Sequence, residues 1–562
     1  MTSNDEIILK EILTKQKQQS YPELSESSFF ELFVADKCLI KYDLSDEEVE
    51  AGITGKGDDG GIDSIYTFVN GKLIYEDTDL SRYRKDVSID LVIIQSKTSN
   101  SFTETVIQRL EDTTIDILEL SKLLNEFELY NKILLARAEY FRSTYKELIS
   151  KFPSLSIFCI YASQGNVDQI HKKVKGRVTK LEYAVKNLLP NTTFNFLFLG
   201  ARELIRLASS SQSASIQMQL LENPIATKKG GYSCLVSLQE YYKFITDSDG
   251  QLKKGIFEAN VRDYEGDVEV NQDIRESLVN NTNEDFWWLN NGVTIIADRG
   301  SVTGKTLTLE NVQIVNGLQT SMEIYTHFKL VSTNNDERSV LVKIITTEDS
   351  ASRDRIIKAT NRQTSVPLAS LRATDEIQRD IEYCFFNYNY YYDRRKNFYK
   401  NQGKPKEKII SIPYLAQAVM AIALKEPDIA RARPSSLLKK QDDYEKVFTK
   451  NYPIKLYLNC VLLMRKVTTY IKLRGENLLE ERSNLKFHIA MYVAIHRMGK
   501  IDYTPKEIAE IDISSIDEQS LEKCFLRVVE IFQNHRAKTK RTADVSAKSK
   551  DLVAEILSDF GT

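Results

Sequence analysis

Hydrophobic and polar positions divide the chain into three stretches of different pattern. Up to residue 207, short apolar runs alternate with longer runs in which apolar residues recur every three or four positions, as they do in strands and helices. This pattern predicts strands at 62–69, 72–76, 91–97, 132–138, 155–163 and 193–200, and helices at 27–40, 102–127, 140–151 and 201–208. Asn70-Gly71, between two apolar runs, predicts a β-hairpin. The first 207 residues are therefore expected to form an α/β domain.

A serine-rich segment, 208–215, is the clearest change of composition and predicts a domain boundary. Residues 216–410 mix strand and helix patterns, so we expect an α+β middle domain there. Residues 411–562 have an almost wholly helical period and predict an α-helical C-terminal region. For Trp287 and Trp288, the only tryptophans, we expect core packing, although alternation on a strand would put one in the core and the other towards a surface or cleft.

Composition excludes some classes of protein. No run reaches the roughly 18 apolar residues that a membrane helix needs, and the N-terminus lacks the pattern of a signal peptide. Six cysteines without a CxxC pair are expected to be buried free thiols, which favours a cytoplasmic location. A net charge of −3 gives no overall basic footprint, so binding of a polyanion would have to be local. Two strongly basic runs, 393–408 and 536–550, are candidates for this.

The first hundred residues contain a set of side chains suited to phosphodiester chemistry. Asp63 begins a strand after a glycine-rich turn, and Gln95 and Lys97 lie at the end of a core strand. Alternate residues of a strand share a face, so Gln95 and Lys97 are expected to project together while Ser96 points away. Glu31, on the helix predicted at 27–40, is expected to approach the same strand end.

Phosphodiester hydrolysis needs a hard cation, and Mg²⁺ (or Mn²⁺) takes oxygen ligands. Asp63 would supply a carboxylate, Gln95 an amide oxygen and Glu31 a second carboxylate, while Lys97 would orient water or stabilise the phosphate. Glu31 also completes a capping-box pattern that begins at Ser28, so a structural role stays open for it. The sequence thus predicts a metal-dependent nuclease site.

The order helix-Glu, GIDSIY and QSK resembles the PD-(D/E)xK nuclease superfamily, particularly its Mrr-like branch. The resemblance covers about residues 25–110. It implies a restriction-endonuclease-like fold for 1–207, with Asp63, Gln95 and Lys97 as catalytic residues and Glu31 as a ligand. The sequence departs from the superfamily pattern by Gly61-Ile62 in place of a proline before the aspartate, and by the uncharged Gln95.

Three polar stretches of the middle domain share amides with glycine or threonine at element ends. They are 286–297, 314–325 and 359–373, and they resemble the AIPR family, the abortive-infection phage-resistance proteins. Amides can recognise a base edge or a nucleotide, and they can equally bridge loops within the protein. The residues predicted to bind or sense a ligand are Asn290, Asn291, Asn316, Gln319, Asn361, Arg362 and Gln363.

A segment in which aromatic and cationic residues alternate is a second candidate for DNA contact, because rings stack on bases and cations neutralise phosphates. Its candidate residues are Tyr391, Arg394, Arg395 and Lys396. The same pattern also suits a tyrosine-rich helix packed on a core with a solvated basic end.

Together these features predict a cytoplasmic bacterial antiviral endonuclease whose nuclease domain is controlled by an AIPR-type sensor domain at 216–410. The expected partners are DNA and a phage-derived trigger, with a homodimer as a further expectation and no membrane. The alternative is a non-catalytic DNA-binding or modification-sensing regulator with a decayed nuclease fold.

Overall fold

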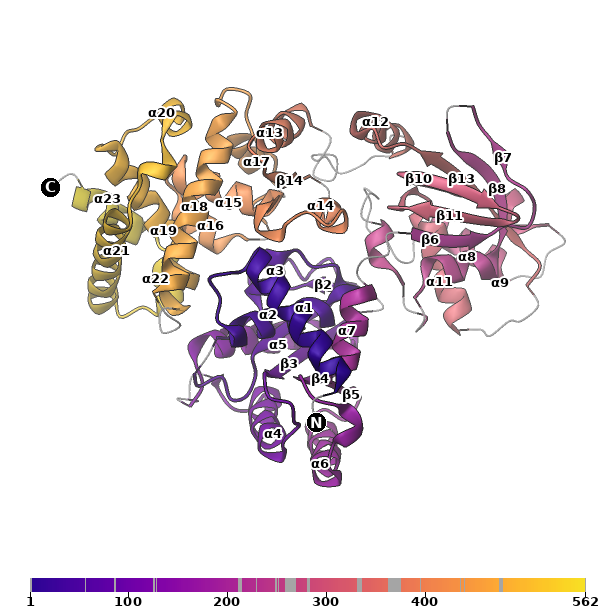
Figure 1. Cartoon of the computed structure of the whole chain (residues 1–562), viewed down its shortest axis with the longest axis horizontal. Coiled ribbons are helices and arrows are strands. Elements are labelled where there is room, and N and C mark those ends of the chain that lie inside the picture. Colours follow the sequence, from indigo (N-terminus) through magenta and orange to yellow (C-terminus); the bar gives the residue numbers. More distant parts are fainter. Residues whose placement is uncertain are drawn as a thin grey trace.

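A computed structural model describes three packed units, which occupy separate parts of Figure 1. We call them the N-terminal unit (residues 3–210), the middle unit (215–361) and the C-terminal unit (375–560). The described residues are 3–55, 57–84, 87–124, 127, 129–210, 215–228, 230–247, 250, 252–257, 269–279, 284–330, 336–361, 375–394, 396–434, 436–438, 440–474 and 479–560.

The N-terminal unit is built on a five-stranded mixed sheet with strand order β2-β1-β3-β4-β5. β1 is antiparallel to β2 and β3, and β3, β4 and β5 are parallel. Its strands are β1 (Ser64–Val69), β2 (Lys72–Leu73), β3 (Ser88–Lys97), β4 (Ser154–Ser163) and β5 (Thr192–Leu199). Asn70 and Gly71 both have positive φ, which confirms the predicted hairpin turn.

Helices cover both faces of this sheet, because β3 is apolar on each side. Val92 and Ile94 pack beneath α2 (Glu26–Cys38) and α7 (Ala201–Ser210), while Leu91 and Ile93 pack beneath α4 (Glu104–Leu118) and α5 (Lys132–Leu148). The remaining helices are α1 (Asn4–Ser20), α3 (Asp46–Ala51) and α6 (Lys172–Leu188). Alternation along the strand therefore sorts its side chains between two helical layers.

The sequence predictions at residues 132–138 and at Ser28 are wrong. The apolar run at 132–138 is not a strand: Asn131 caps the backbone N–H of Leu134 and opens the single helix α5. Ser28 does not cap a helix, because α2 begins three residues earlier at the N-cap Ser25, whose hydroxyl accepts from the N–H of Ser28. Glu31 therefore lies inside α2 and is not part of a capping box.

The middle unit contains a five-stranded sheet, β12-β9-β13-β8-β7, and a three-stranded sheet, β10-β11-β6. Its strands are β6 (Ser215–Gln219), β7 (Ile225–Ala226), β8 (Tyr232–Ser237), β9 (Val293–Ala297), β10 (Arg299–Thr303), β11 (Thr306–Glu310), β12 (Gln313–Asn316) and β13 (Ser339–Thr346). Its helices are α8 (Leu238–Ile245), α9 (Glu269–Val279), α10 (Phe286–Leu289), α11 (Leu318–Leu330) and α12 (Ser350–Asn361). Phe286 fills the core, whereas Trp287 is partly buried and Trp288 is 61% exposed, so the expectation of core packing is wrong for Trp288.

The C-terminal unit is helical apart from the two-stranded sheet of β14 (Tyr391–Asp393) and β15 (Ile409–Ser411). Its helices are α13 (Glu376–Asn387), α14 (Phe398–Asn401), α15 (Ile412–Ile422), α16 (Pro427–Ala432), α17 (Gln441–Val447), α18 (Lys455–Leu473), α19 (Leu479–Met498), α20 (Pro505–Glu510), α21 (Glu518–Thr539), α22 (Ala543–Ala547) and α23 (Lys550–Phe560). One large apolar cluster holds this unit together and draws on residues from Ile377 to Ile556. The boundaries placed at 207 and 410 from sequence stay predictions.

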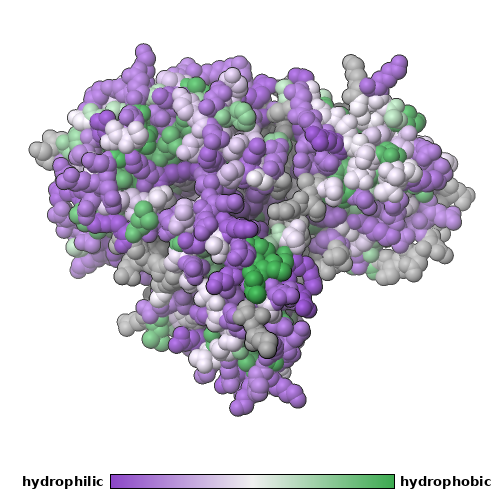
Figure 2. Space-filling view, in the orientation of Figure 1, coloured by the Kyte–Doolittle hydropathy of each residue, from purple (hydrophilic) through white to green (hydrophobic). Residues whose placement is uncertain are grey.

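The chain has a mixed α/β architecture with a helical C-terminal part, as the sequence pattern predicted. The face drawn in Figure 2 is mostly hydrophilic, with scattered apolar side chains. No helix among the described residues has the length and apolar character needed to span a membrane. All six cysteines are free, and five of them are buried.

Candidate functional site

Asp63 lies at the end of the N-terminal sheet where β1 begins and β3 ends. Its backbone N–H donates to the carbonyl oxygen of Ile94, which fixes the position of the residue against β3. The side chain is buried, and its Oδ2 accepts from Gln95 Nε2 at 2.6 Å, Ser96 N at 2.6 Å and Ser96 Oγ at 2.9 Å. All of its described side-chain hydrogen bonds end on Oδ2, so none of them uses Oδ1.

Ser96 was missed by sequence reasoning, and the expectation that it points away from the site is wrong. Alternation does place Ser96 on the opposite face of β3 from Gln95. Asp63, however, lies just before β1 at the end of β3 and accepts hydrogen bonds from both residues. The small hydroxyl directly between Gln95 and Lys97 was the available signal, since a buried carboxylate requires donors.

Gln95 is buried, and in the described part of the chain only the nitrogen of its side-chain amide forms hydrogen bonds. Nε2 donates to Asp63 and to the Ser96 carbonyl, whereas Oε1 is buried without a hydrogen-bond partner among the described residues. Gly61 lies against this oxygen: a Cβ there would be 3.2 Å from Gln95 Oε1, and its φ of +81° favours glycine. Because Gly61 has no side chain, the turn before Asp63 leaves the unpaired Gln95 Oε1 uncovered on that side.

The pKa of the Asp63 carboxyl group is raised above its usual value. Burial raises the pKa of Asp63 to about 6, against the lowering effects of the Ser96 backbone hydrogen bond and of Lys97. Lys97 itself is exposed at the end of β3. The strand end thus carries one buried carboxylate, one unpaired amide oxygen and one exposed cation.

Glu31 lies on the other face of β3 from Gln95. It is buried on α2, which packs with Val92 and Ile94 on the opposite face of β3 from Gln95. Ser27 Oγ donates to Glu31 Oε1 at 3.2 Å. Among the described residues, no group of three or more His, Cys, Asp or Glu side chains is arranged to hold a metal ion.

The amide motifs of the middle unit come together in the structure. A Cβ on Gly317 would lie 2.9 Å from the carbonyl oxygen of Gly292, so the turns that follow Asn291 and Asn316 touch through their backbones. Asn316 Nδ2 donates to the carbonyl oxygen of Thr360 at 3.4 Å, which joins the end of α12 to the same place. Three stretches far apart in sequence therefore meet at one end of the sheet.

The amide side chains of these motifs differ in their hydrogen bonding and exposure. Asn290 donates within the protein, to Ser277 and Phe286, which is the bridging role. Asn291 and Asn316 are exposed, and Gln319 Oε1 is buried without a described partner. Arg362 and Gln363 lie outside the described residues, as does the side chain of Asn361.

The aromatic and basic segment of the C-terminal unit packs against the protein. Arg394 is buried between Asp354, at 3.0 Å, and Glu382, at 2.7 Å. Lys396 contacts Glu48 of the N-terminal unit at 2.7 Å, and Tyr391 is partly buried against Tyr399. Arg395 lies outside the described residues.

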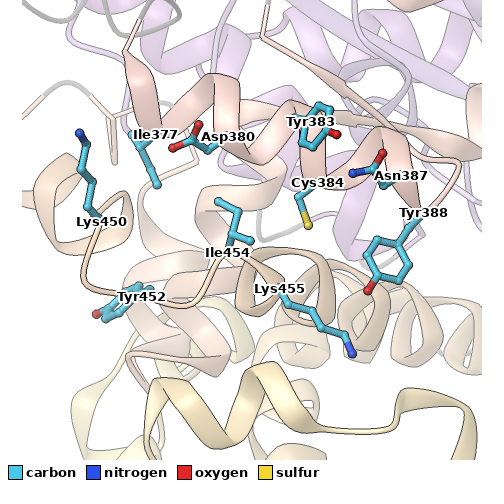
Figure 3. A pocket seen from close by; sticks show the side chains of 10 residues that line it. All are labelled: Ile377, Asp380, Tyr383, Cys384, Asn387, Tyr388, Lys450, Tyr452, Ile454 and Lys455. Atoms are coloured by element: carbon cyan, nitrogen blue, oxygen red, sulfur yellow. The ribbon is translucent and has the colours of Figure 1, made fainter.

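A pocket of about 540 Å³ lies between α13 and the start of α18 (Figure 3). In this view the side chain of the buried Cys384 points from α13 towards the segment that carries Ile454 and Lys455. The lining residues are Ile377, Asp380, Tyr383, Cys384, Asn387, Tyr388, Lys450, Tyr452, Ile454 and Lys455. Sequence reasoning did not predict this pocket, because its two walls are more than 60 residues apart in the chain.

A family model described as AIPR protein matches residues 257–543, just over half of the chain. The chain belongs to the AIPR family, and membership suggests involvement in abortive-infection defence against phage. The match spans the converging amide motifs, the aromatic and basic segment and most of the C-terminal helices. Neither the curated proteins nor the solved structures contain a match.

Proposed function

We propose that the N-terminal unit is a metal-dependent DNA endonuclease and that the AIPR part of the chain controls it in phage defence. The observation that carries the proposal is the arrangement at the end of β3. There Asp63 is held by three donors on one oxygen, Gln95 keeps an unpaired buried oxygen, and Lys97 follows at the exposed end. The order of these residues also matches the PD-(D/E)xK resemblance.

The residues present fit a hard divalent cation. A buried acceptor without a hydrogen-bond partner is costly, and Gln95 Oε1 is such an acceptor beside a carboxylate with one oxygen still available. Asp63 and Gln95 would hold Mg²⁺ or Mn²⁺, with Glu31 as a further proposed ligand. A bound cation would lower the pKa of a water nucleophile and neutralise charge on the phosphate.

Ser96, Gln95 and Lys97 would orient the carboxylate and bind the phosphate. Ser96 and the Gln95 amide group fix Asp63 Oδ2, which orients the carboxylate before DNA binds. Lys97 is exposed and would bind a phosphate oxygen or orient water, because an ammonium group is a compact charge with three donors.

Control by the rest of the chain is the second half of the proposal. Asn291, Asn316 and Gln319 converge at one end of the middle sheet, where they would recognise a base edge or a phage-derived feature. We place DNA contact on the aromatic and basic segment as well, through Tyr391 and Lys396 with Arg395, whereas Arg394 is committed to two carboxylates.

Cleavage of plasmid and phage DNA with Mg²⁺, with Mn²⁺ and with EDTA tests the proposal. We expect cleavage only with a metal, and loss of at least about a hundredfold in Asp63→Asn. Asp58→Asn is the matched control, since Asp58 lies in the same turn, is exposed and has a positive φ that asparagine tolerates. Full activity in Asp63→Asn would disprove the site. DNA binding without cleavage would support the non-catalytic regulator instead.

A further inference from the structure

At the contact between the N-terminal and C-terminal units, acidic and basic residues lie on opposite sides. In every ion pair between these units among the described residues, the acid belongs to the N-terminal unit and the base to the C-terminal unit. The acidic face consists of Asp36, Asp46, Glu48, Glu50 and Glu76, and the basic face of Lys396, Lys400, Lys406, Arg431, Lys472 and Lys548.

Asp36 is the best-paired acid of this contact. It is 7% exposed and lies 3.0 Å from Lys400 and 3.0 Å from Lys406. Burial alone would raise the pKa of Asp36, but Lys406, Lys400 and Lys37 outweigh it and hold the pKa well below its usual range. Asp46 shares two of these lysines at 3.5 and 3.3 Å. The ion pairs therefore form a network and not a set of isolated contacts.

Apolar packing contributes little to this contact. Each hydrophobic cluster of the described residues belongs to one unit: three lie within residues 9–208, and the large helical cluster lies within 377–560. The contact is made of charges and of hydrogen bonds such as those from Asn397 Nδ2 to Asp43 and from Ser436 N to Asp77. Polar contacts of this kind between domains resemble transient interfaces, so separation of the units is the expected motion.

The basic face has the chemistry of a surface for nucleic acid. Lys396, Lys400 and Lys406 follow Tyr391 in the chain. Just before it, α13 exposes Tyr383 by 72% and Phe386 by 59%, and the C-cap residue Tyr388 is 51% exposed. Two of these rings also line the pocket of Figure 3 with Lys450 and Lys455. Lysines neutralise phosphates and exposed rings stack on bases, so the C-terminal unit carries both kinds of group that nucleic acid binding uses.

One part of the contact lies far from Asp63. Asn397 binds Asp43, and the neighbouring Tyr42 donates to Asp90 near the start of β3, whereas Asp63 binds Ser96 near its end. Six residues of strand separate Asp90 from Ser96, about 20 Å. Another part lies nearer, because Lys472 pairs with Glu50, and Thr54, four residues further along the chain, donates its backbone N–H to the Asp63 carbonyl oxygen.

We propose that the acidic face of the N-terminal unit occupies a nucleic-acid surface of the C-terminal unit and that DNA displaces it. Phosphates and the acidic side chains compete for the same lysines, so binding of DNA releases the N-terminal unit from this closed arrangement. The choice of DNA as the polyanion rests on the proposed function. The intramolecular competition is tested without any cleavage.

Zero-length carbodiimide cross-linking of full-length Asp63→Ala protein reports the contact directly. Lys396–Glu48 and Lys472–Glu50 are 2.7 and 2.9 Å apart and should cross-link in the free protein. A 30-base-pair duplex at saturating concentration should reduce both yields at least fivefold. The Lys186–Glu182 pair, 2.6 Å apart within α6, is the internal control and should not change. Unchanged yields at Lys396 and Lys472 with bound duplex would overturn the proposal.

A variant that lacks acidic residues of the N-terminal unit tests the same competition through DNA affinity. Asp46→Asn, Glu48→Gln and Glu50→Gln together free lysines of the basic face while sparing the buried Asp36. In the Asp63→Ala background, DNA affinity at low salt should rise at least tenfold, and the slope of log affinity against log salt should steepen by about 3. The matched control removes three exposed acids, Glu11, Glu147 and Asp168, for the same change in net charge. Equal affinities of the two triple variants would overturn the proposal. If the unmodified protein did not cleave DNA, the proposed function would be wrong, but the competition for the lysines would not be affected.

Discussion

At the scale of single residues, the chemistry of this chain depends on how buried polar groups are satisfied. Asp63 is stable inside the protein because three donors converge on one of its oxygens. Ser96 supplies two of them, which makes it a positioning residue for the carboxylate. The unpaired Gln95 oxygen beside it is the feature that a cation would satisfy.

Ser96→Ala should weaken metal use without unfolding the N-terminal unit. The backbone N–H of residue 96 and Gln95 still donate to Asp63, but the carboxylate loses its third restraint. We expect the Mg²⁺ concentration for half-maximal cleavage to rise about tenfold. Ser99→Ala, two residues beyond the end of β3, is the control. An unchanged metal requirement in Ser96→Ala would show that the hydroxyl is only structural.

Asp393 should make stability depend on pH. Burial raises the pKa of Asp393 to about 7, although backbone N–H groups of Tyr399 and Asn397 donate to it. Between about pH 4 and pH 7 the folded chain binds a proton that the unfolded chain does not, so stability falls as the pH rises. The slope is up to about 1.4 kcal/mol per pH unit.

Asp393→Asn should therefore flatten the decrease in thermal midpoint between pH 5 and pH 8, measured by circular dichroism. Asp502→Asn, an exposed acid of the same unit, should leave it unchanged. The same decrease in Asp393→Asn as in the parent protein would contradict the assignment.

At the scale of elements, positive-φ glycines bring the family motifs together. Gly292 and Gly317 have φ of +72° and +96°, and the backbone at Gly317 approaches the Gly292 carbonyl too closely for a side chain. The middle sheet therefore ends in two touching turns that present Asn291 and Asn316. The glycines of these motifs allow the close backbone approach, and the side chains of Asn291 and Asn316 stay exposed beside it.

Gly317→Ala should destabilise the middle unit more than Gly304→Ala. Both positions have positive φ, which costs alanine about 1–2 kcal/mol. A Cβ at Gly304 meets open space, whereas one at Gly317 meets the Gly292 carbonyl and adds about 1–3 kcal/mol. Urea unfolding followed by tryptophan fluorescence reports this unit alone, because both tryptophans of the chain, Trp287 and Trp288, lie in it. Equal midpoints for the two variants would contradict the close approach.

At the scale of the whole molecule, three separate cores are joined by polar contacts. The N-terminal unit keeps its apolar side chains in clusters of its own, and its contact with the C-terminal unit is charged. Such an arrangement lets the N-terminal unit and the AIPR part move as separate bodies.

A fragment of residues 1–210 should fold by itself. Its three clusters contain no residue beyond 208, so removing the rest of the chain exposes little apolar surface. We expect a helix-rich circular dichroism spectrum and a cooperative thermal transition. A fragment that is insoluble or melts without cooperativity would show that the unit needs its neighbours.

The sequence by itself determined features that are local along the chain. Period and turn residues predicted β3, the Asn70-Gly71 hairpin, the helical C-terminal part and the order of Asp63, Gln95 and Lys97, because each depends on neighbours a few positions away. The family motifs were recognisable for the same reason. The run at 132–138 was misjudged, because a short apolar run fits a buried helix as well as a strand.

Tertiary structure alone decided which distant groups meet. It joined Ser96 to Asp63, brought Gly292 against Gly317, and placed Glu31 in the helical layer away from Gln95. It also turned the basic segment, which the sequence presented as free for DNA, towards acids more than 300 residues earlier in the chain. No pattern along the chain contains these partners, because charge pairing in a folded protein depends on proximity in space and not on separation in sequence.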